Sequence, residues 1–208
     1  MRLRYIIYVL VALLLMAPMN VAAKKKTNDQ QAEEIFRKVY GMVFGPQGCQ
    51  LSYAVNIIGM YKTEGTIYYK GKKVHYDEPR FSSWQDGVTA YMVDKKKKEV
   101  RIHRADDEKK DKYLSKFKCD LNGFIYSMKT DGDYYLVTAK LKNARYFGIR
   151  WVELKVRKGT LYPVSLGIKM AFMHTTVKIT GFKTGGIADQ VFVYPASRFT
   201  GYKVTDNR

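Results

Sequence analysis

Histidine and cysteine, the residues that most often hold catalytic metals, are scarce in this sequence, which has three histidines and two cysteines among 208 residues. His75, His103 and His174 lie far apart, and none belongs to a motif with the spacing of metal ligands. The cysteines also lack a second ligand at suitable spacing. The sequence therefore predicts neither a metal nor a cofactor.

Recognisable catalytic motifs are also missing. The chain contains no GxSxG elbow, no phosphate-binding loop and no glycine fingerprint of a dinucleotide site. Its carboxylates are scattered, and no pair stands out as an acid and a base. We therefore expect a protein that is not an enzyme, and keep a secreted hydrolase with an unrecognised site as an alternative.

Long apolar runs are absent except at the N-terminus. Arg2 and Arg4 precede an apolar stretch over residues 5–16, and Val21-Ala22-Ala23 has the small residues of a cleavage site. The stretch is shorter than the roughly 18 residues needed to span a bilayer. We expect a signal peptide over residues 1–23, cleaved after Ala23, and one mature domain over residues 24–208. A retained N-terminal anchor is the alternative.

Acidic residues are outnumbered, since 19 Asp and Glu stand against 37 Lys and Arg and give a formal net charge of +18. Such a charge favours anionic surfaces, among them phospholipid, lipopolysaccharide, nucleic acid and acidic proteins. Export makes nucleic acid the least expected of these partners.

Cys49 and Cys119 are the two cysteines, and an oxidising compartment would allow them to pair. A bridge would close a loop of about 70 residues and stabilise the fold by roughly 4 kcal/mol. Two buried or reduced thiols are the equal alternative, because the sequence does not establish that the two lie close together.

Periodicity predicts one amphipathic helix over residues 27–44. Thr27, Asn28 and Asp29 are candidate caps, and apolar residues recur at helical spacing after them. Gly45-Pro46-Gln47-Gly48 should end this helix. A second, shorter helix is predicted from the acidic turn at Asp106 to Phe117.

The rest of the chain alternates with a period of two, which is typical of half-buried antiparallel strands. Turn signals such as Asp86-Gly87, Asp131-Gly132, Lys158-Gly159 and Gly185-Gly186 separate most of the candidates. We expect a mainly β (α+β) sandwich or open barrel. The predicted strands are residues 51–57, 67–69, 74–76, 80–84, 88–93, 100–103, 134–141, 150–156, 164–170, 173–182 and 191–194.

Bulky apolar residues are abundant, with 17 Tyr, 10 Phe, 2 Trp and 9 Met. A sheet curved around a cavity would use Tyr and Phe to line it and Met as an adaptable wall. Ordinary core packing would account for the same residues. The sequence leaves both interpretations open.

The order of elements, together with two local stretches, resembles the periplasmic outer-membrane lipoprotein carrier family, LolA. The stretches are Gly65-Thr66-Ile67-Tyr68-Tyr69-Lys70 with the following Pro79-Arg80-Phe81, Asp86-Gly87-Val88-Thr89-Ala90-Tyr91 and Val100, and Ile187-Ala188-Asp189-Gln190-Val191-Phe192-Val193-Tyr194-Pro195 with Gly201-Tyr202-Lys203-Val204-Thr205-Asp206.

This resemblance implies an unclosed, strongly curved antiparallel half-barrel with helical lids, whose hydrophobic cavity accepts the acyl chains of lipoproteins. The family arginine that holds the lid has no match here, because the corresponding place is near Gly71-Lys72. Lys72 would replace it imperfectly, since an ammonium lacks the planar fork of a guanidinium.

The resemblance therefore implies a monomeric periplasmic carrier that takes acylated lipoproteins from an inner-membrane transporter to an outer-membrane receptor or lipid surface. A regulatory or sensory lipid-binding domain of the same fold is the alternative. Strand alternation and apolar character select the cavity residues Tyr53, Val55, Ile57, Ile67, Tyr69, Tyr91, Trp151 and Phe192. The expected lid residues are Ile35, Phe36, Val39, Tyr40, Tyr113, Leu114 and Phe117.

Overall fold

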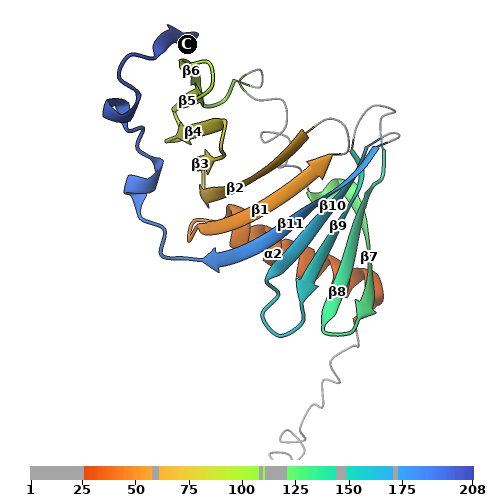
Figure 1. Ribbon diagram of the computed structural model, residues 1–208. Helices are drawn as coiled ribbons and strands as arrows, with labels where there is room; N and C mark the ends of the chain where they lie inside the picture. The colour runs from red at the N-terminus through yellow and green to blue at the C-terminus, as the bar shows by residue number, and fades with distance from the viewer. Residues whose placement is uncertain (1–25, 58–60, 108–109, 111–120, 144–148, 171–172) are drawn as a thin grey trace, which may run out of the picture.

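One open, curved sheet dominates the computed structural model (Figure 1). The structure describes residues 26–57, 61–107, 110, 121–143, 149–170 and 173–208, and within these ranges the sheet has twelve strands. In chain order they are β1 (Cys49–Ile57), β2 (Tyr61–Lys70), β3 (Lys73–Asp77), β4 (Phe81–Gln85), β5 (Thr89–Asp94), β6 (Glu99–Arg104), β7 (Phe124–Asp131), β8 (Tyr134–Leu141), β9 (Ile149–Arg157), β10 (Pro163–Met170), β11 (Met173–Thr184) and β12 (Lys203–Asp206).

The order across the sheet is β12-β6-β5-β4-β3-β2-β1-β11-β10-β9-β8-β7. Strand β12 runs parallel to β6, while the other neighbouring pairs in this order are antiparallel. Strands β7 and β12 form the two edges, so the barrel is unclosed. The mainly β half-barrel expected from the sequence is confirmed.

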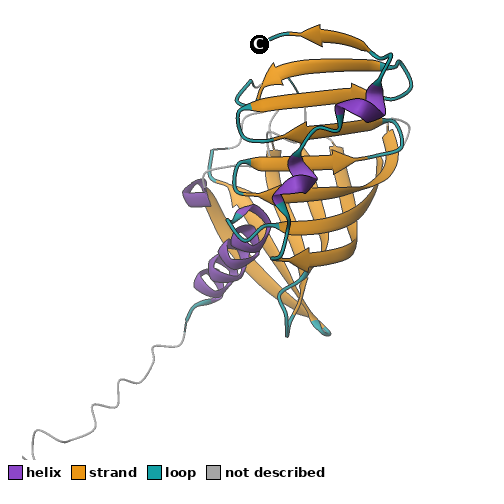
Figure 2. Cartoon of the chain, turned by 90° about the vertical axis from the view of Figure 1, so that its left-hand side faces the viewer, coloured by secondary structure: helices purple, strands orange, loops and turns teal. Residues whose placement is uncertain are grey.

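A bulge adds to the bend in the middle of the sheet. Ser52 lies opposite Gly181, whereas the next residue, Tyr53, lies opposite Ile179, so β11 has one extra residue there. Bulges of this kind increase the local twist of a strand pair. Seen from the side, the sheet is curved, so that one of its faces is concave and the other convex (Figure 2).

Helix α2 (Asn28–Phe44) lies on the concave side, behind β8 to β11 in Figure 1. Its start is capped locally, because the Gln30 side chain accepts a hydrogen bond of 3.2 Å from the Thr27 backbone N–H. At the other end the Gly45 N–H donates to the Gly41 carbonyl at 2.9 Å. The predicted helix is thus confirmed. Among the described residues no helix is long and apolar enough to cross a membrane.

After β11 the chain leaves the sheet and crosses its convex face. Two 3-10 turns, η3 (Asp189–Phe192) and η4 (Ala196–Phe199), lie on this path and cover β3 to β6 (Figure 2). The strand predicted over residues 191–194 is therefore wrong. A further 3-10 turn, η2 (Leu121–Gly123), precedes β7. Most of the second predicted helix, including Tyr113, Leu114 and Phe117, lies outside the described residues.

Candidate functional site

The concave face of the sheet is the candidate site, and α2 covers one half of it. The helix buries Phe36 and Val39 against strands β7 to β9. Asn28 fixes its first turn to the edge strand β7 through two hydrogen bonds of 2.9 Å with the Met128 backbone. The helix-packed cluster consists of Ala32, Phe36, Val39, Phe124, Tyr126, Val137, Ala139, Leu154 and Val156.

A second apolar cluster continues the concave face beyond the end of α2. Its residues come from β1, β2, β3 and β5, and Phe44 at the end of α2 contacts it with its ring 4.9 Å from the ring of Tyr69. We call this set the inner cluster: Cys49, Leu51, Tyr53, Ile67, Tyr69, Val74, Tyr76 and Met92.

Strand register makes the inner surface continuous from one wall to the other. One row of directly opposite residues runs from β1 to β5, and a second runs from β1 to β7 through β11, β10, β9 and β8. Side chains that lie opposite one another share a face, so each row presents one surface. The first row is Leu51, Ile67, Tyr76, Ser83 and Met92, and the second is Val55, Val177, Leu166, Leu154, Val137 and Met128.

Two buried hydroxyl groups interrupt this apolar surface. Ser83 belongs to the first row, and Thr175 lies opposite Ile168 on the same face. Within the described structure neither hydroxyl oxygen has a hydrogen-bond partner. A buried hydroxyl without a partner costs about 1–3 kcal/mol, so each is a site where a polar ligand atom would be stabilising.

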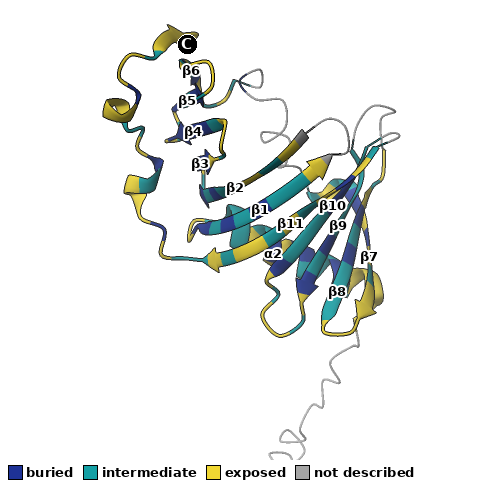
Figure 3. Ribbon diagram, in the orientation of Figure 1, coloured by how far each residue is buried: buried dark blue, intermediate teal, exposed yellow. Residues whose placement is uncertain are grey.

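The structure brings four of the predicted cavity residues together. Tyr53, Ile67 and Tyr69 belong to the inner cluster, and Val55 packs against it. Ile57 ends β1, and its side chain lies outside the description. Tyr53, Ile67 and Tyr69 are buried. Figure 3 colours the ribbon by burial, with buried residues in dark blue.

Three other predicted cavity residues lie elsewhere. Tyr91 lies opposite Trp84 on the convex side and stacks on Tyr194, with ring centroids 4.3 Å apart. Trp151 lies on the convex side because its neighbour Val152 faces α2. Phe192 is buried, but in η3 and not on a strand.

The predicted lid residues of α2 divide into two groups. Phe36 and Val39 are buried in the helix-packed cluster, and Ile35 packs against it. Tyr40 lies nearer the inner cluster, with its ring 4.7 Å from that of Phe44. The C-terminal turn of α2 thus places two aromatic rings beside the inner cluster.

A backbone contact holds this end of α2 at the place where the resemblance implied an arginine. The Gly71 N–H donates to the Gly45 carbonyl at 3.1 Å, and the neighbouring Lys72 is exposed. Gly71 has a φ of 59°, a conformation that suits glycine in the tight turn between β2 and β3. The β2–β3 turn therefore contacts the helix end through its backbone.

Cys49 is fully buried, and its thiol has no disulfide partner among the described residues. Burial raises the pKa of this thiol to about 12. Cys119 lies outside the described residues, so its pairing stays a prediction.

The convex face has an aromatic cluster that the sequence analysis did not identify. Trp84, Val93, Val100 and Phe199 are buried together, with Tyr194 and Tyr202 packed against them. A hollow of about 260 Å³ lies beside it, lined by Tyr68, His75, Trp84, Gln190, Val191, Val193, Pro195 and Arg198. The apolar residues near the C-terminus were the available signal, but the sequence predicted a strand there.

Groups that could hold a metal are absent from the described ranges, where no three His, Cys, Asp or Glu side chains come together. Another hollow, of about 680 Å³, lies along the solvent side of α2 and is lined by charged and polar side chains: Lys26, Gln30, Glu33, Glu34, Arg37 and Lys38.

No family model matches this chain, and no curated protein matches it. Among solved structures, an uncharacterised conserved protein of Thermus thermophilus matches 86% of this chain and 100% of its own, with a TM-score of 0.56 and 12% identity. This likeness shows a shared fold.

Two further solved structures match this chain with lower scores. A LolA superfamily protein of Nitrosomonas europaea matches 79% of this chain and 98% of its own at 10% identity, with a TM-score of 0.40. A putative outer membrane lipoprotein-sorting protein domain of Vibrio parahaemolyticus matches 83% of this chain and 99% of its own at 7% identity, with a TM-score of 0.43.

Proposed function

We propose that the concave face binds the acyl chains of lipoproteins and that the protein carries them through the periplasm without making or breaking a bond. The observation that supports this most is that buried apolar side chains line the inner face from β5 through β1 to β7. A core formed only by the sheet and α2 would need them mainly on β7 to β9, where the helix-packed cluster lies. The resemblance of the sequence to lipoprotein carriers supports the same function.

The energetics of such a complex suit an apolar surface. Each CH₂ group that leaves water contributes ~0.8 kcal/mol, so an acyl chain needs a dry, extended surface more than it needs specific polar contacts. Met92 in the inner cluster adds a flexible side chain that adapts to chains of different shape. The unpartnered hydroxyls of Ser83 and Thr175 can donate hydrogen bonds to ester carbonyls at the head of the cargo.

The C-terminal turn of α2 would act as the lid. Phe44 already contacts Tyr69, so an acyl chain that enters here replaces one set of apolar contacts by another. Such an exchange costs little free energy overall, which suits a carrier that must both accept and release its cargo. The first turn of α2 would stay fixed by Asn28 and Met128 while the last turn moves.

The test is binding of a fluorescent, palmitoylated peptide to the purified protein. Val55→Lys places an ammonium on the inner row and should weaken binding at least tenfold, whereas Val204→Lys, at an exposed position on β12, should leave it unchanged. Circular dichroism checks that both variants fold. Equal affinities for the two variants, or no binding by the original protein, would reject the proposal.

A second measurement addresses the lid without adding a charge. Phe44→Ala removes the ring that contacts Tyr69, and it should speed the release of the bound peptide several-fold. Mass spectrometry of the protein purified from periplasm should also detect copurified lipoproteins. Release at the original rate would exclude the last turn of α2 as the lid.

A further inference from the structure

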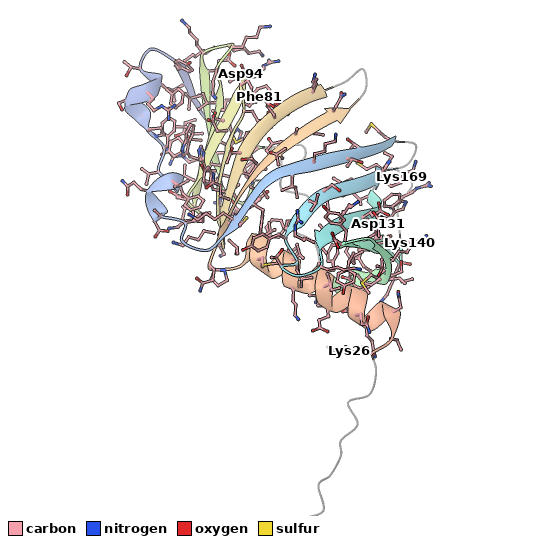
Figure 4. The ribbon with its side chains drawn as sticks, turned by 60° about the horizontal axis from the view of Figure 1, so that its bottom comes forward. Lys26, Phe81, Asp94, Asp131, Lys140 and Lys169 are labelled. Carbon is pink, nitrogen blue, oxygen red and sulfur yellow. The ribbon has the colours of Figure 1, made fainter. Side chains whose placement is uncertain are left out.

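A row of five residues crosses the convex face of the sheet from β7 to β11. Ile125 lies opposite Lys140, Lys140 opposite Trp151, Trp151 opposite Lys169, and Lys169 opposite His174. With strands spaced ~4.8 Å apart, the four steps extend over roughly 19 Å. We call this set the outer row; Figure 4 labels two of its members, Lys140 and Lys169.

The outer row faces away from α2 and from the candidate cargo site. Its chain neighbours Tyr126, Ala139 and Ile168 are buried on the concave side, and successive residues of a strand point to opposite faces. Ile125 is 57% exposed, and Lys140 and His174 are exposed as well. A large apolar side chain, two lysines and two aromatic rings therefore share one outward surface.

The two lysines have no neutralising partner in the part of the chain that the structure describes. Lys155, two outward positions along β9 from Trp151, shows the contrast, because its ammonium lies 2.8 Å from the Asp131 carboxylate. Lys140 and Lys169 make no comparable ion pair among the described residues. Their positive charge is thus available to a partner.

Glycine at position 167 allows the two rings of the outer row to meet. Trp151 on β9 and His174 on β11 flank β10, and their ring centroids lie 5.2 Å apart. A Cβ atom at Gly167 would lie 3.3 Å from Nε2 of His174, closer than ordinary van der Waals contact. The absent side chain leaves room for the two rings to form a shared surface beside Lys169.

We propose that the outer row is a docking surface for membranes that contain anionic phospholipid. Lysine ammonium groups pair with phosphate, the amphipathic indole of Trp151 suits the headgroup level, and exposed Ile125 can insert among the upper acyl segments. An acidic protein would use the lysines but would gain nothing from the exposed isoleucine, which favours the membrane. The proposal does not depend on acyl-chain binding, since that site lies on the opposite face.

Intrinsic fluorescence gives a local test, because the chain has two tryptophans and one of them, Trp84, is buried. Trp84→Phe leaves Trp151 as the single reporter. Its emission should shift to the blue, and brominated lipids should quench it, when vesicles of phosphatidylcholine and phosphatidylglycerol are added. Vesicles of phosphatidylcholine alone should produce neither effect. An unchanged Trp151 spectrum with anionic vesicles would overturn the proposal.

Two variants that lose the same charge distinguish the contribution of the outer row to membrane binding from that of the protein's net positive charge. Lys140→Gln with Lys169→Gln should lower partition into anionic vesicles at least tenfold. Lys96→Gln with Lys97→Gln removes the same charge from the exposed turn between β5 and β6 and should change partition less than twofold. Equal losses in the two variants would overturn the proposal, because long-range charge alone would then explain binding.

Two further experiments test the apolar contact of Ile125 and the alternative that the partner is an acidic protein. Ile125→Ser should weaken partition several-fold without changing the net charge. Polyglutamate, used as a model of an acidic protein, should bind weakly and leave Trp151 emission unshifted. Binding of polyglutamate as tight as that of vesicles, with no effect of Ile125→Ser, would assign the outer row to an acidic protein and overturn the membrane proposal.

Discussion

Asn28 and Met128 are joined by two hydrogen bonds of 2.9 Å, in which the Asn28 amide donates to the Met128 carbonyl and its side-chain oxygen accepts from the Met128 N–H. Met128 lies on β7, an edge strand whose outer backbone groups have no neighbouring strand among the described residues. The asparagine side chain therefore takes the place of a strand residue and fastens the start of α2 to the sheet.

Asn28→Ala should lower the free energy of unfolding by about 1–2 kcal/mol, because it removes both hydrogen bonds. Urea titration followed by circular dichroism measures the change. Asn28→Asp keeps the acceptor and loses the donor, so its effect should be smaller. An unchanged unfolding midpoint in Asn28→Ala would contradict this role of the side chain.

Gly65 lies opposite Tyr53, and a Cβ atom at position 65 would lie 2.6 Å from the Asp77 carbonyl oxygen. The contact is with backbone, so Gly65→Ala must push β2 and β3 apart and should destabilise the protein by roughly 1–3 kcal/mol. Gly159→Ala is the matched control, since a Cβ there meets nothing within 4 Å. A loss of stability no larger than that of the control would contradict the prediction.

The thiolate is the reactive form of cysteine, and burial raises the pKa of Cys49 to about 12. Iodoacetamide at pH 8 should therefore leave Cys49 unmodified in the folded protein and modify it in denaturant, as mass spectrometry can follow. Rapid modification of the folded protein would exclude a buried thiol. Denatured, unreduced protein that also stays unmodified would contradict a free Cys49 thiol and support a disulfide with Cys119.

Asp94 should couple the stability of the β4–β5 region to pH. Burial would raise the pKa of Asp94, but hydrogen bonds from Arg80 and from the Lys97 and Lys96 backbones outweigh it and hold the pKa below its usual value. The stabilisation is therefore present above about pH 5 and is lost as the pH falls through the folded-state pKa.

Asp94→Asn should destabilise the protein by about 1–2 kcal/mol at pH 7, and by progressively less as the pH falls below about 4. Denaturant titrations at several pH values measure this. Asp133→Asn is a suitable control because it removes an exposed carboxylate from the turn between β7 and β8. A penalty that stays constant from pH 7 to pH 3 would contradict the coupling.

Local signals in the sequence were sufficient for α2 and for most strands. The predicted helix over 27–44 differs from α2 by the capping residue alone, and β8 matches its predicted range. Strand β7 was not predicted, because Phe124, Ile125 and Tyr126 form an apolar run without alternation. Ile125 breaks the pattern by being exposed, which is consistent with a contact outside the fold.

The face of the sheet to which each side chain points was harder to predict than the position of the strand along the chain. On β5, buried residues occupy both faces, since the C-terminal segment covers the convex side, so alternation does not reveal where Tyr91 points. On β9, Val152, Leu154 and Val156 mark the inward phase and place Trp151 outward. That signal was present in the sequence, whereas the course of residues 185–199 depends on tertiary contacts.

The parallel pairing of β12 with β6 has a consequence for the protein in a crowded compartment. An unclosed barrel has two borders at which a strand from another molecule could add, which is how ordered aggregates begin. β12 occupies one border with a strand of four residues whose Lys203 and Asp206 are exposed, and short charged strands are poor templates. Asn28 engages Met128 at the other border, so intermolecular strand addition is disfavoured at both.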